Sequence, residues 1–260
     1  MRQKKDHYIL YKKKLAYKYS LELVHPMIIG NWLLAHAFKK YETIDDIIIF
    51  ASWVSDSKNS TEKDFIREYI LLTEILSNYP NKKIVYFSTC WIYDPSLLDS
   101  NYVKHKLYME NIITARTTNY LICRLPNIAW YSQNPNTILN FLYHHIHNDI
   151  PFDLWIHAER NILDIADATN IIDYIISTKE KYNQTITIAN THNYRIIDIV
   201  KAFEDILKKN AIYKKLDIWS QINIDTSYIS KIYDTLNISF DLQYLPRTLS
   251  KYYHTTDQNI

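Results

Sequence analysis

The sequence predicts a doubly wound α/β fold, in which helices cover both faces of a mainly parallel sheet. Several short apolar runs do not alternate with polar residues, which is typical of strands buried on both faces. Helical patterns lie between these runs, as the crossovers of a parallel sheet require. The chain has 260 residues, 47% of them hydrophobic, so it can bury a full core. The expected strands are 26–30, 46–51, 83–89, 120–125 and 185–189.

Apolar residues at helical spacing predict the helices that join these strands. The connection between Ala35 and Ile47 has room only for the end of one helix and a short loop. The strands Pro26–Gly30 and Asp46–Ala51 should therefore be parallel neighbours, with the first at the edge of the sheet. Residues 160–165 are expected to be extended. The expected helices are 33–41, 61–77, 101–116, 137–147, 167–177 and 196–208.

Composition narrows the class of protein further. The net charge of +2 gives no reason to expect a nucleic-acid partner. No apolar run reaches the roughly 18 residues that a membrane span needs. Cys90 and Cys123 lie in apolar, strand-like runs, so a reduced, cytoplasmic protein is expected. Residues 1–24 form a basic, tyrosine-rich extension, which is either a solvated arm or a contact for a polyanion.

The chain contains a single glycine, Gly30, and an excess of Ile, Asn, Lys and Tyr. Such a bias can remove glycine wherever the backbone does not need it. Gly30 opens the segment GNWLLA between the first strand and the first helix. A dinucleotide-binding fold places G-x-G-x-x-G/A there, so that a pyrophosphate rests on the helix N-terminus. Gly30 and Ala35 match this pattern, but Trp32 replaces the middle glycine and would crowd the phosphates.

Tyr102 and Lys106 are spaced so that both side chains lie on one face of a helix. A nearby ammonium lowers the pKa of a phenol, so Tyr102 could act as a general acid or base. The preceding strand ends in the hydroxyls of Ser88 and Thr89, which could polarise a substrate oxygen beside Tyr102. The alternative is an exposed pair on a lysine-rich helix. The same spacing occurs without such a strand at Tyr8–Lys12 and Tyr79–Lys83.

Other polar clusters predict no metal site. His144, His145 and His147 do not converge on one point together with a carboxylate, so a solvated helix face is the better interpretation. Asp164 and Asp167 could form a pair of carboxylates, but Asp167 is expected to be the N-cap of the helix that follows.

Several of these motifs resemble, in order, those of the extended short-chain dehydrogenase/reductases, also called NAD-dependent epimerase/dehydratases. Tyr102–Lys106 matches the family's Y-x-x-x-K helix, and Val85–Tyr93 (VYFSTCWIY) looks like its serine-rich strand and "VYG" element. Arg124–Asn127 resembles the R-x-x-N element beside the nicotinamide. Arg160–Asp167 is similar to a segment that returns the chain from the substrate region, and Ile48–Ser52 to a strand whose end faces the cofactor.

The resemblance implies a Rossmann-type core with a small C-terminal substrate region. The usual second and third strands do not fit into the short segment before Ile47 and are expected to be missing. The core would comprise 25–190, with 131–159 contributing to the substrate region, and 191–260 would form a C-terminal substrate region or cap. A homodimer is compatible with this organisation.

The resemblance also implies roles for individual residues. Tyr102 would be the general acid/base, Lys106 would hold the nicotinamide ribose, and Thr89 would hydrogen-bond the reacting oxygen. The substrate would be a small molecule of the nucleotide-sugar type, bound by Asn127 and Arg160. Arginines 124 and 160 could meet its diphosphate or form structural ion pairs. The cofactor would be NAD or NADP, bound by Gly30, Asn31, Ala35, Ala51, Ser52, Lys106 and Pro126.

The sequence departs from the family pattern in ways that bear on function. Asp94 stands at the glycine of "VYG", and the strand that normally reads the adenosine ribose is missing, so the choice between NAD and NADP stays open. Cys90 and Trp91 replace the Asp-Glu pair of sugar 4,6-dehydratases, which disfavours dehydration. The leading hypothesis is an NAD(P)-dependent oxidoreductase or epimerase acting on a nucleotide-activated sugar. The alternative is a degenerate relative with a binding or regulatory role and no catalysis.

Overall fold

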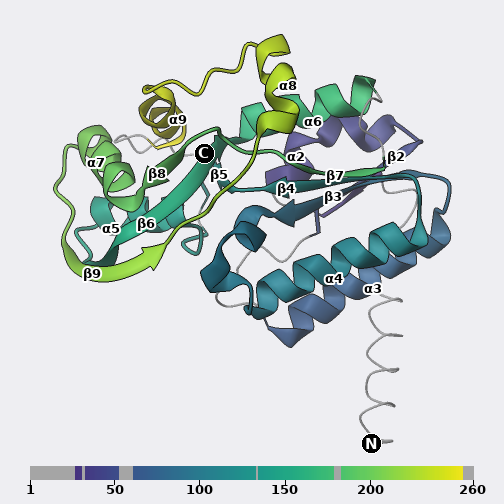
Figure 1. The fold of residues 1–260 in the computed structure, drawn as a ribbon, viewed down its shortest axis with the longest axis horizontal. Coiled ribbons are helices and arrows are strands. Elements are labelled where there is room, and N and C mark those ends of the chain that lie inside the picture. The colour runs from purple at the N-terminus through teal and green to yellow at the C-terminus, as the bar shows by residue number, and fades with distance from the viewer. Residues whose placement is uncertain (1–26, 31–32, 53–60, 133, 179–182, 254–260) are drawn as a thin grey trace, which may run out of the picture.

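The computed structural model describes residues 27–30, 33–52, 61–132, 134–178 and 183–253, and it has the predicted α/β architecture (Figure 1). One part is a parallel sheet with helices on both faces, and the other is a smaller mixed sheet packed against helices. The predicted basic extension 1–24 lies outside the described residues. No helix among those described is long and apolar enough to cross a membrane.

The main sheet is five-stranded and parallel, in the order β1-β2-β3-β4-β7. In the described part of the chain β1 pairs only with β2, so it lies at the edge of the sheet, which confirms the prediction from the short Ala35–Ile47 connection. The usual second and third strands have no counterpart among these residues. The strands are Ile28–Ile29 (β1), Ile47–Phe50 (β2), Lys83–Thr89 (β3), Tyr120–Leu125 (β4) and Gln184–Thr187 (β7).

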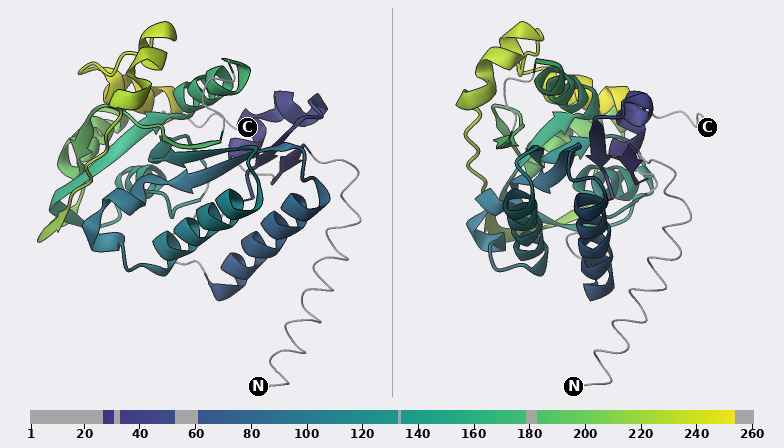
Figure 2. Two further views of the ribbon diagram at one scale, coloured as in Figure 1. Left: turned by 45° about the vertical axis from the view of Figure 1, so that its right-hand side comes forward. Right: turned by 90° about the vertical axis from the view of Figure 1, so that its right-hand side faces the viewer.

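Helices cover both faces of this sheet, as a doubly wound fold requires (Figure 2). One face carries α3 (Glu62–Asn78) and α4 (Asn101–Arg116). The other carries α2 (Leu33–Ala37) and α6 (Ile165–Thr178). The predicted helix 33–41 is divided, because α2 ends at Ala37 and a 3-10 helix, Lys39–Thr43, follows.

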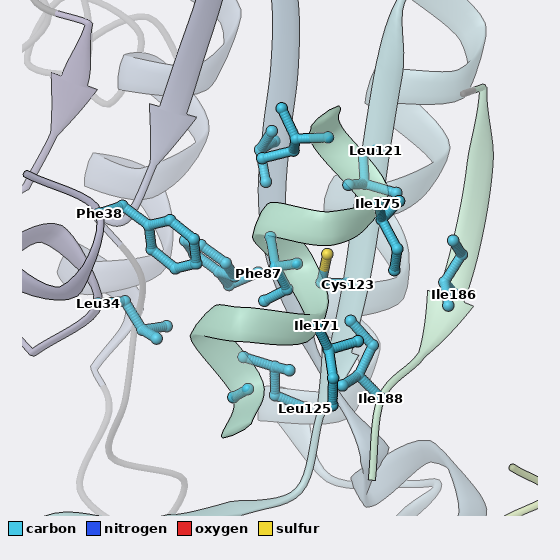
Figure 3. Packing of buried hydrophobic residues seen from close by; sticks show 14 of the residues in the cluster. Leu34, Phe38, Phe87, Leu121, Cys123, Leu125, Ile171, Ile175, Ile186 and Ile188 are labelled. Atoms are coloured by element: carbon cyan, nitrogen blue, oxygen red, sulfur yellow. The ribbon is translucent and has the colours of Figure 1, made fainter. Parts of the chain in front are cut away.

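Strand β3 is buried along its whole length because both of its faces are covered. Its side chains alternate, so Phe87 enters the core beneath α2 and α6, whereas Tyr86 enters the core beneath α3 and α4. Figure 3 shows the first of these cores, in which Phe38 stacks on Phe87 with the ring centroids 5.5 Å apart. The continuous run of apolar residues in this strand is therefore explained by the burial of both of its faces.

The second sheet is built on the long strand β6 (Phe152–Asp164), of which only the end was expected to be extended. It packs on α5 (Ile138–His147), α7 (Ile196–Leu207) and α9 (Tyr244–Tyr252) around a core of its own. The helix α8 (Ser230–Thr235) packs against the core of the main sheet. The partners of β6 are Asn127–Ala129 (β5), Asn193–Arg195 (β8) and Tyr213–Ser220 (β9).

Asp164, rather than Asp167, stands at the start of α6. The helix begins at Ile165, and the Asp164 carboxylate accepts a hydrogen bond of 2.8 Å from the amide of Ala166. Asp167 lies within the first turn, where its carboxylate accepts a hydrogen bond from Tyr244 instead. The prediction of Asp167 as the N-cap is therefore wrong, because β6 extends further than the sequence pattern indicated and ends on the capping residue itself.

Gly30 follows β1 with φ of +124°, a conformation that L side chains rarely adopt. A Cβ atom there would lie 2.7 Å from the carbonyl carbon and oxygen of Ala51 and 2.9 Å from the amide nitrogen of Ser52. The single glycine is therefore kept where the ends of β1 and β2 approach too closely for any other residue. The other described residues with positive φ lie in the ordinary left-handed region, at Asp149, Asn183, Lys208 and Asn237.

Replacing Gly30 by alanine should destabilise the fold by roughly 1–3 kcal/mol, because it adds backbone strain and a contact with backbone atoms of β2. Urea denaturation should show a lower midpoint at an unchanged m value. Lys208→Gly is the control, since Lys208 caps α7 at a φ of 55°, where glycine relieves strain and should leave stability unchanged or raised. An alanine variant as stable as the wild-type chain would contradict this account.

Candidate active site

The carboxyl end of β3 is the centre of the predicted site, and open α/β sheets bind ligands at this edge. Thr89 is the last residue of β3 and is 2% exposed. Its hydroxyl accepts a hydrogen bond of 3.1 Å from the amide of Trp91, which begins a tight 3-10 turn over Cys90–Tyr93. The chain therefore leaves the sheet at Thr89 without exposing its side chain.

Helix α4 carries the two other predicted catalytic residues. It begins after Ser100, whose hydroxyl accepts a hydrogen bond of 3.2 Å from the amide of Val103. Tyr102 is 5% exposed and Lys106 is fully buried, so both lie on the inner face of the helix. The alternative of an exposed pair is therefore wrong.

Tyr102 and Thr89 are both buried at the carboxyl end of β3, and the Thr89 side chain lies close enough to the Tyr102 phenol to affect its pKa. Burial raises the pKa of Tyr102 well above its ordinary value, the hydrogen bond with Thr89 opposes this only in part, and the Glu68 carboxylate raises the pKa further. The expectation that Lys106 lowers the pKa of this phenol is therefore wrong. Tyr102 is a neutral phenol near neutral pH and can donate a hydrogen bond or a proton.

Lys106 is held by acceptors on β3 and α3. Its ammonium donates to Glu68 Oε1 at 2.8 Å, to the Tyr86 hydroxyl at 2.9 Å and to the Phe87 carbonyl oxygen at 3.3 Å. These contacts use the three donors that an ammonium has. The other oxygen of Glu68 lies 3.0 Å from Nε2 of His105. Burial alone would raise the pKa of Glu68, but Lys106 and His105 outweigh it and bring it to about 2.

The prediction that Thr89, Tyr102 and Lys106 share a water-accessible pocket is wrong. All three are at most 5% exposed, and the Lys106 ammonium is directed at Glu68. Sequence reasoning missed Glu68, because a glutamate inside an amphipathic helix is ordinarily solvated. The sequence does contain a signal for the burial of Glu68, because this residue lies on the same face of its helix as the buried Leu72 and Ile75.

Arg124 forms a structural ion pair, one of the two possibilities that the sequence left open. Its Nε and Nη2 donate to the two oxygens of Glu110 at 3.0 and 2.6 Å, and its Nη1 lies 3.2 Å from the Tyr93 hydroxyl. Ser88, which precedes Thr89, donates its hydroxyl to the same carboxylate at 2.5 Å. This network fixes β4 and α4 against β3 directly behind the candidate site.

Arg160 lies against the turn that follows Thr89. Its guanidinium lies over the Trp91 ring, 5.0 Å from the centroid, and its Nη1 donates to the Ser220 hydroxyl at 2.9 Å. Ser220 in turn donates to the buried carboxylate of Asp94 at 2.8 Å. Asp94, at the position of the "VYG" glycine, therefore ties the turn to β6 and β9. Asn127 is half-buried and donates to the carbonyl oxygen of Asn161 at 3.1 Å.

Three of the predicted cofactor residues lie together at the ends of β1 and β2. Gly30 lies against the backbone of Ala51 and Ser52 at the ends of β1 and β2. Ala35 is buried in the core beneath α2, and the half-buried Pro126 links β4 to β5. Asn31 and Trp32 lie outside the described residues. The strands that normally face the adenosine half of a dinucleotide have no counterpart in the described part of the chain.

The described residues form no group of three or more His, Cys, Asp or Glu side chains suited to a metal ion. His145 uses Nδ1 in a contact of 2.8 Å with the Phe141 carbonyl oxygen, and His144 uses Nδ1 in a contact of 3.1 Å with Asn148. These two histidines therefore contribute to the local structure of α5.

Solved structures show which proteins share this fold. The UDP-glucose 4-epimerase of Thermus thermophilus, in complex with NAD, has a TM-score of 0.66 at 12% identity over 84% of this chain and 80% of its own. The dTDP-glucose 4,6-dehydratase of Bacillus anthracis, also with NAD, has a TM-score of 0.62 at 18% identity over 86% and 76%. The RMD protein of Pseudomonas aeruginosa, complexed with NADPH, has a TM-score of 0.61 at 12% identity over 79% of both chains.

The fold is therefore that of the NAD-dependent sugar-nucleotide epimerases and dehydratases, as the motifs predicted, in a chain without the usual second and third strands among its described residues. No protein-family model matches the sequence, and no curated protein is significantly similar to it. At such low identities the likeness shows the fold alone.

Replacing Glu68 by glutamine should destabilise the protein by about 3–5 kcal/mol, because it leaves the fully buried Lys106 ammonium without its counter-charge. Chemical denaturation measures this loss. Asp99→Asn, which breaks the exposed pair with Lys104, is the control and should leave stability unchanged. Adding Lys106→Met to Glu68→Gln should restore much of the loss, and a double variant no more stable than Glu68→Gln would refute the pairing.

The same carboxylate should give the protein a defined acid sensitivity. The pKa of Glu68 falls from 4.5 to about 2 on folding, so its contribution to stability is present above pH 4.5 and disappears as the pH falls towards 2. The difference in free energy of unfolding between the wild-type protein and Glu68→Gln should therefore shrink across this range. A constant difference between pH 6 and pH 2.5 would show that Glu68 has an ordinary pKa in the folded protein.

Proposed function

We propose that this chain is an NAD(P)H-dependent reductase that acts on a keto group of a nucleotide-linked sugar. The observation that carries the proposal is the Tyr102–Thr89 pair at the carboxyl end of β3, with Tyr102 held in its protonated form. Solved structures of the same fold contain NAD or NADPH, and one contains UDP-glucose, which supports this class of cofactor and substrate.

In this proposal the buried Thr89 and Tyr102 become accessible when cofactor and substrate bind, and both then act on the oxygen of the reacting carbonyl. Thr89 donates a hydrogen bond to it, and Tyr102 donates the proton that turns it into a hydroxyl. A bound nicotinamide would supply the hydride. Epimerisation or alcohol oxidation instead starts with proton removal by a phenolate, which the burial of Tyr102 opposes. The buried phenol is in the protonation state that reduction requires at its start.

The residues that would hold the cofactor are those at the ends of β1 and β2 and after β4. Gly30, Ala51 and Ser52 would contact it on one side, and Pro126 on the other. Lys106 acts in this proposal through Glu68, by fixing α4 so that Tyr102 meets Thr89, rather than through the nicotinamide ribose. Asn127 and Arg160 would meet the substrate, and within the described residues the hydrogen bonds of the Arg160 guanidinium use only Nη1, with Glu159 and Ser220 as acceptors.

The second candidate function is ligand binding without catalysis, by a chain that keeps the fold but has lost the activity. It is favoured by one observation, namely that the donors of Lys106 are already used by Glu68, Tyr86 and the Phe87 carbonyl. Mass spectrometry of small molecules released from the purified protein separates the two candidates. A co-purified dinucleotide supports the reductase, and a nucleotide sugar without a dinucleotide, together with no NADPH binding in a fluorescence titration, supports the second candidate.

Tyr102→Phe should lower the turnover number for reduction of a keto-sugar nucleotide by roughly 10²–10⁴-fold, because it removes a positioned proton donor. The dissociation constant for NADPH should stay nearly unchanged. Tyr79→Phe is the matched control, since Tyr79 has the same spacing to a lysine but follows the end of α3, and its turnover should equal that of the wild-type protein. Full activity of Tyr102→Phe on an established substrate would refute the assignment of this site.

A further inference from the structure

A cavity of about 440 Å³ lies between α6, the loop before α9 and α9 itself, and no residue of the candidate active site lines it. Figure 1 shows these helices beside one another on the side of the main sheet away from α3 and α4. This volume lies within the range of small-molecule sites. The polar residues on its wall include Asp164, Asp167, Asn170, Ser239, Arg247 and Lys251.

The two acidic groups of the cavity differ in how completely they are satisfied. Asp164 accepts hydrogen bonds from the Ala166 amide at 2.8 Å, from Lys251 at 2.9 Å and from the Tyr252 hydroxyl at 2.5 Å. Asp167 accepts one, from the Tyr244 hydroxyl to Oδ2 at 2.6 Å. Within the described residues, its Oδ1 atom has no hydrogen-bond partner.

Burial raises the pKa of Asp167, and the neighbouring Asp164 carboxylate adds to this, against the effects of Tyr244, Lys251 and Arg247. Because Tyr244 bonds only Oδ2, a ligand that carries a positive charge could approach Asp167 at Oδ1 and would stabilise the carboxylate.

The basic groups of the cavity are already paired. Lys251 donates to Asp164, and Arg247 lies 3.5 Å from Asp241 with its guanidinium over the Tyr244 ring. Both basic groups thus already face a carboxylate, whereas Oδ1 of Asp167 has no hydrogen-bond partner within the described residues. The exposed Asn170 and Ser239 carry short polar side chains at the rim, which suit the hydroxyl groups of a ligand.

We propose that this cavity binds a small polyhydroxylated amine, such as an amino sugar, with its ammonium group on Asp167 Oδ1 and its hydroxyls on the Asn170 and Ser239 rim. The site is separate from the Tyr102–Thr89 pair, so the proposal stands whether or not the chain is a reductase. The proposed reductase activity and the proposed amine site can be tested independently, because ligand binding in this cavity requires no dinucleotide.

Isothermal titration with D-glucosamine near neutral pH tests the proposal. D-Glucose and N-acetyl-D-glucosamine are the matched probes, because they keep the ring and its hydroxyls but carry no charge. Glucosamine should bind saturably and at least ten-fold more tightly than either. Equal binding of the three sugars, or no heat of binding from glucosamine at millimolar concentrations, would overturn the proposal.

Variants locate the binding within the molecule. Asp167→Asn should weaken glucosamine binding at least ten-fold, and Asp205→Asn, which removes an exposed carboxylate on α7 away from the cavity, should leave it unchanged. Asn170→Lys is the second variant. Asn170 is exposed, so this substitution should not affect folding, and the added ammonium should repel glucosamine. Wild-type affinity in both Asp167→Asn and Asn170→Lys would place any binding elsewhere and refute the proposal.

Discussion

The buried ion pair between Glu68 and Lys106 is the interaction on which the candidate site depends. It joins α3 to α4 beneath β3, and the hydroxyl of Tyr86 and the carbonyl of Phe87 complete its hydrogen bonds. Two charges in a core are tolerated only when each compensates the other, so the pair fixes the position of α4 relative to the strand. One turn before Lys106, the same helix brings Tyr102 to Thr89.

The positions of the main strands could be predicted because β2, β3 and β4 are buried on both faces, which leaves continuous apolar runs in the sequence. The edge position of β1 followed from the length of one connection. The second sheet was largely missed, because β9 is mostly exposed and its lysines and aspartate give no strand pattern. The extent of β6 was missed because its first half is not continuously buried like the strands of the main sheet.

The candidate site could be predicted in part. The end of a buried strand and the first turn of the next helix meet in a parallel α/β unit, which is why the Thr89–Tyr102 contact followed from the motifs. The partner of Lys106 did not follow, because Glu68 lies on another helix and no local pattern marks a buried glutamate. The environment of Asp167 could not be predicted for a similar reason, since it depends on where Tyr244 and α9 pack.

The most direct test of this account is the Nζ resonance of Lys106 in protein labelled with ¹⁵N-lysine, assigned by its absence from Lys106→Met and followed as NADPH is added. A fully buried ammonium on three acceptors should exchange its protons slowly enough to be observed, and the resonance should keep its shift, because Lys106 stays on Glu68. The absence of such a resonance, or its displacement on addition of NADPH, would show that Lys106 is free to serve the cofactor and would contradict the account.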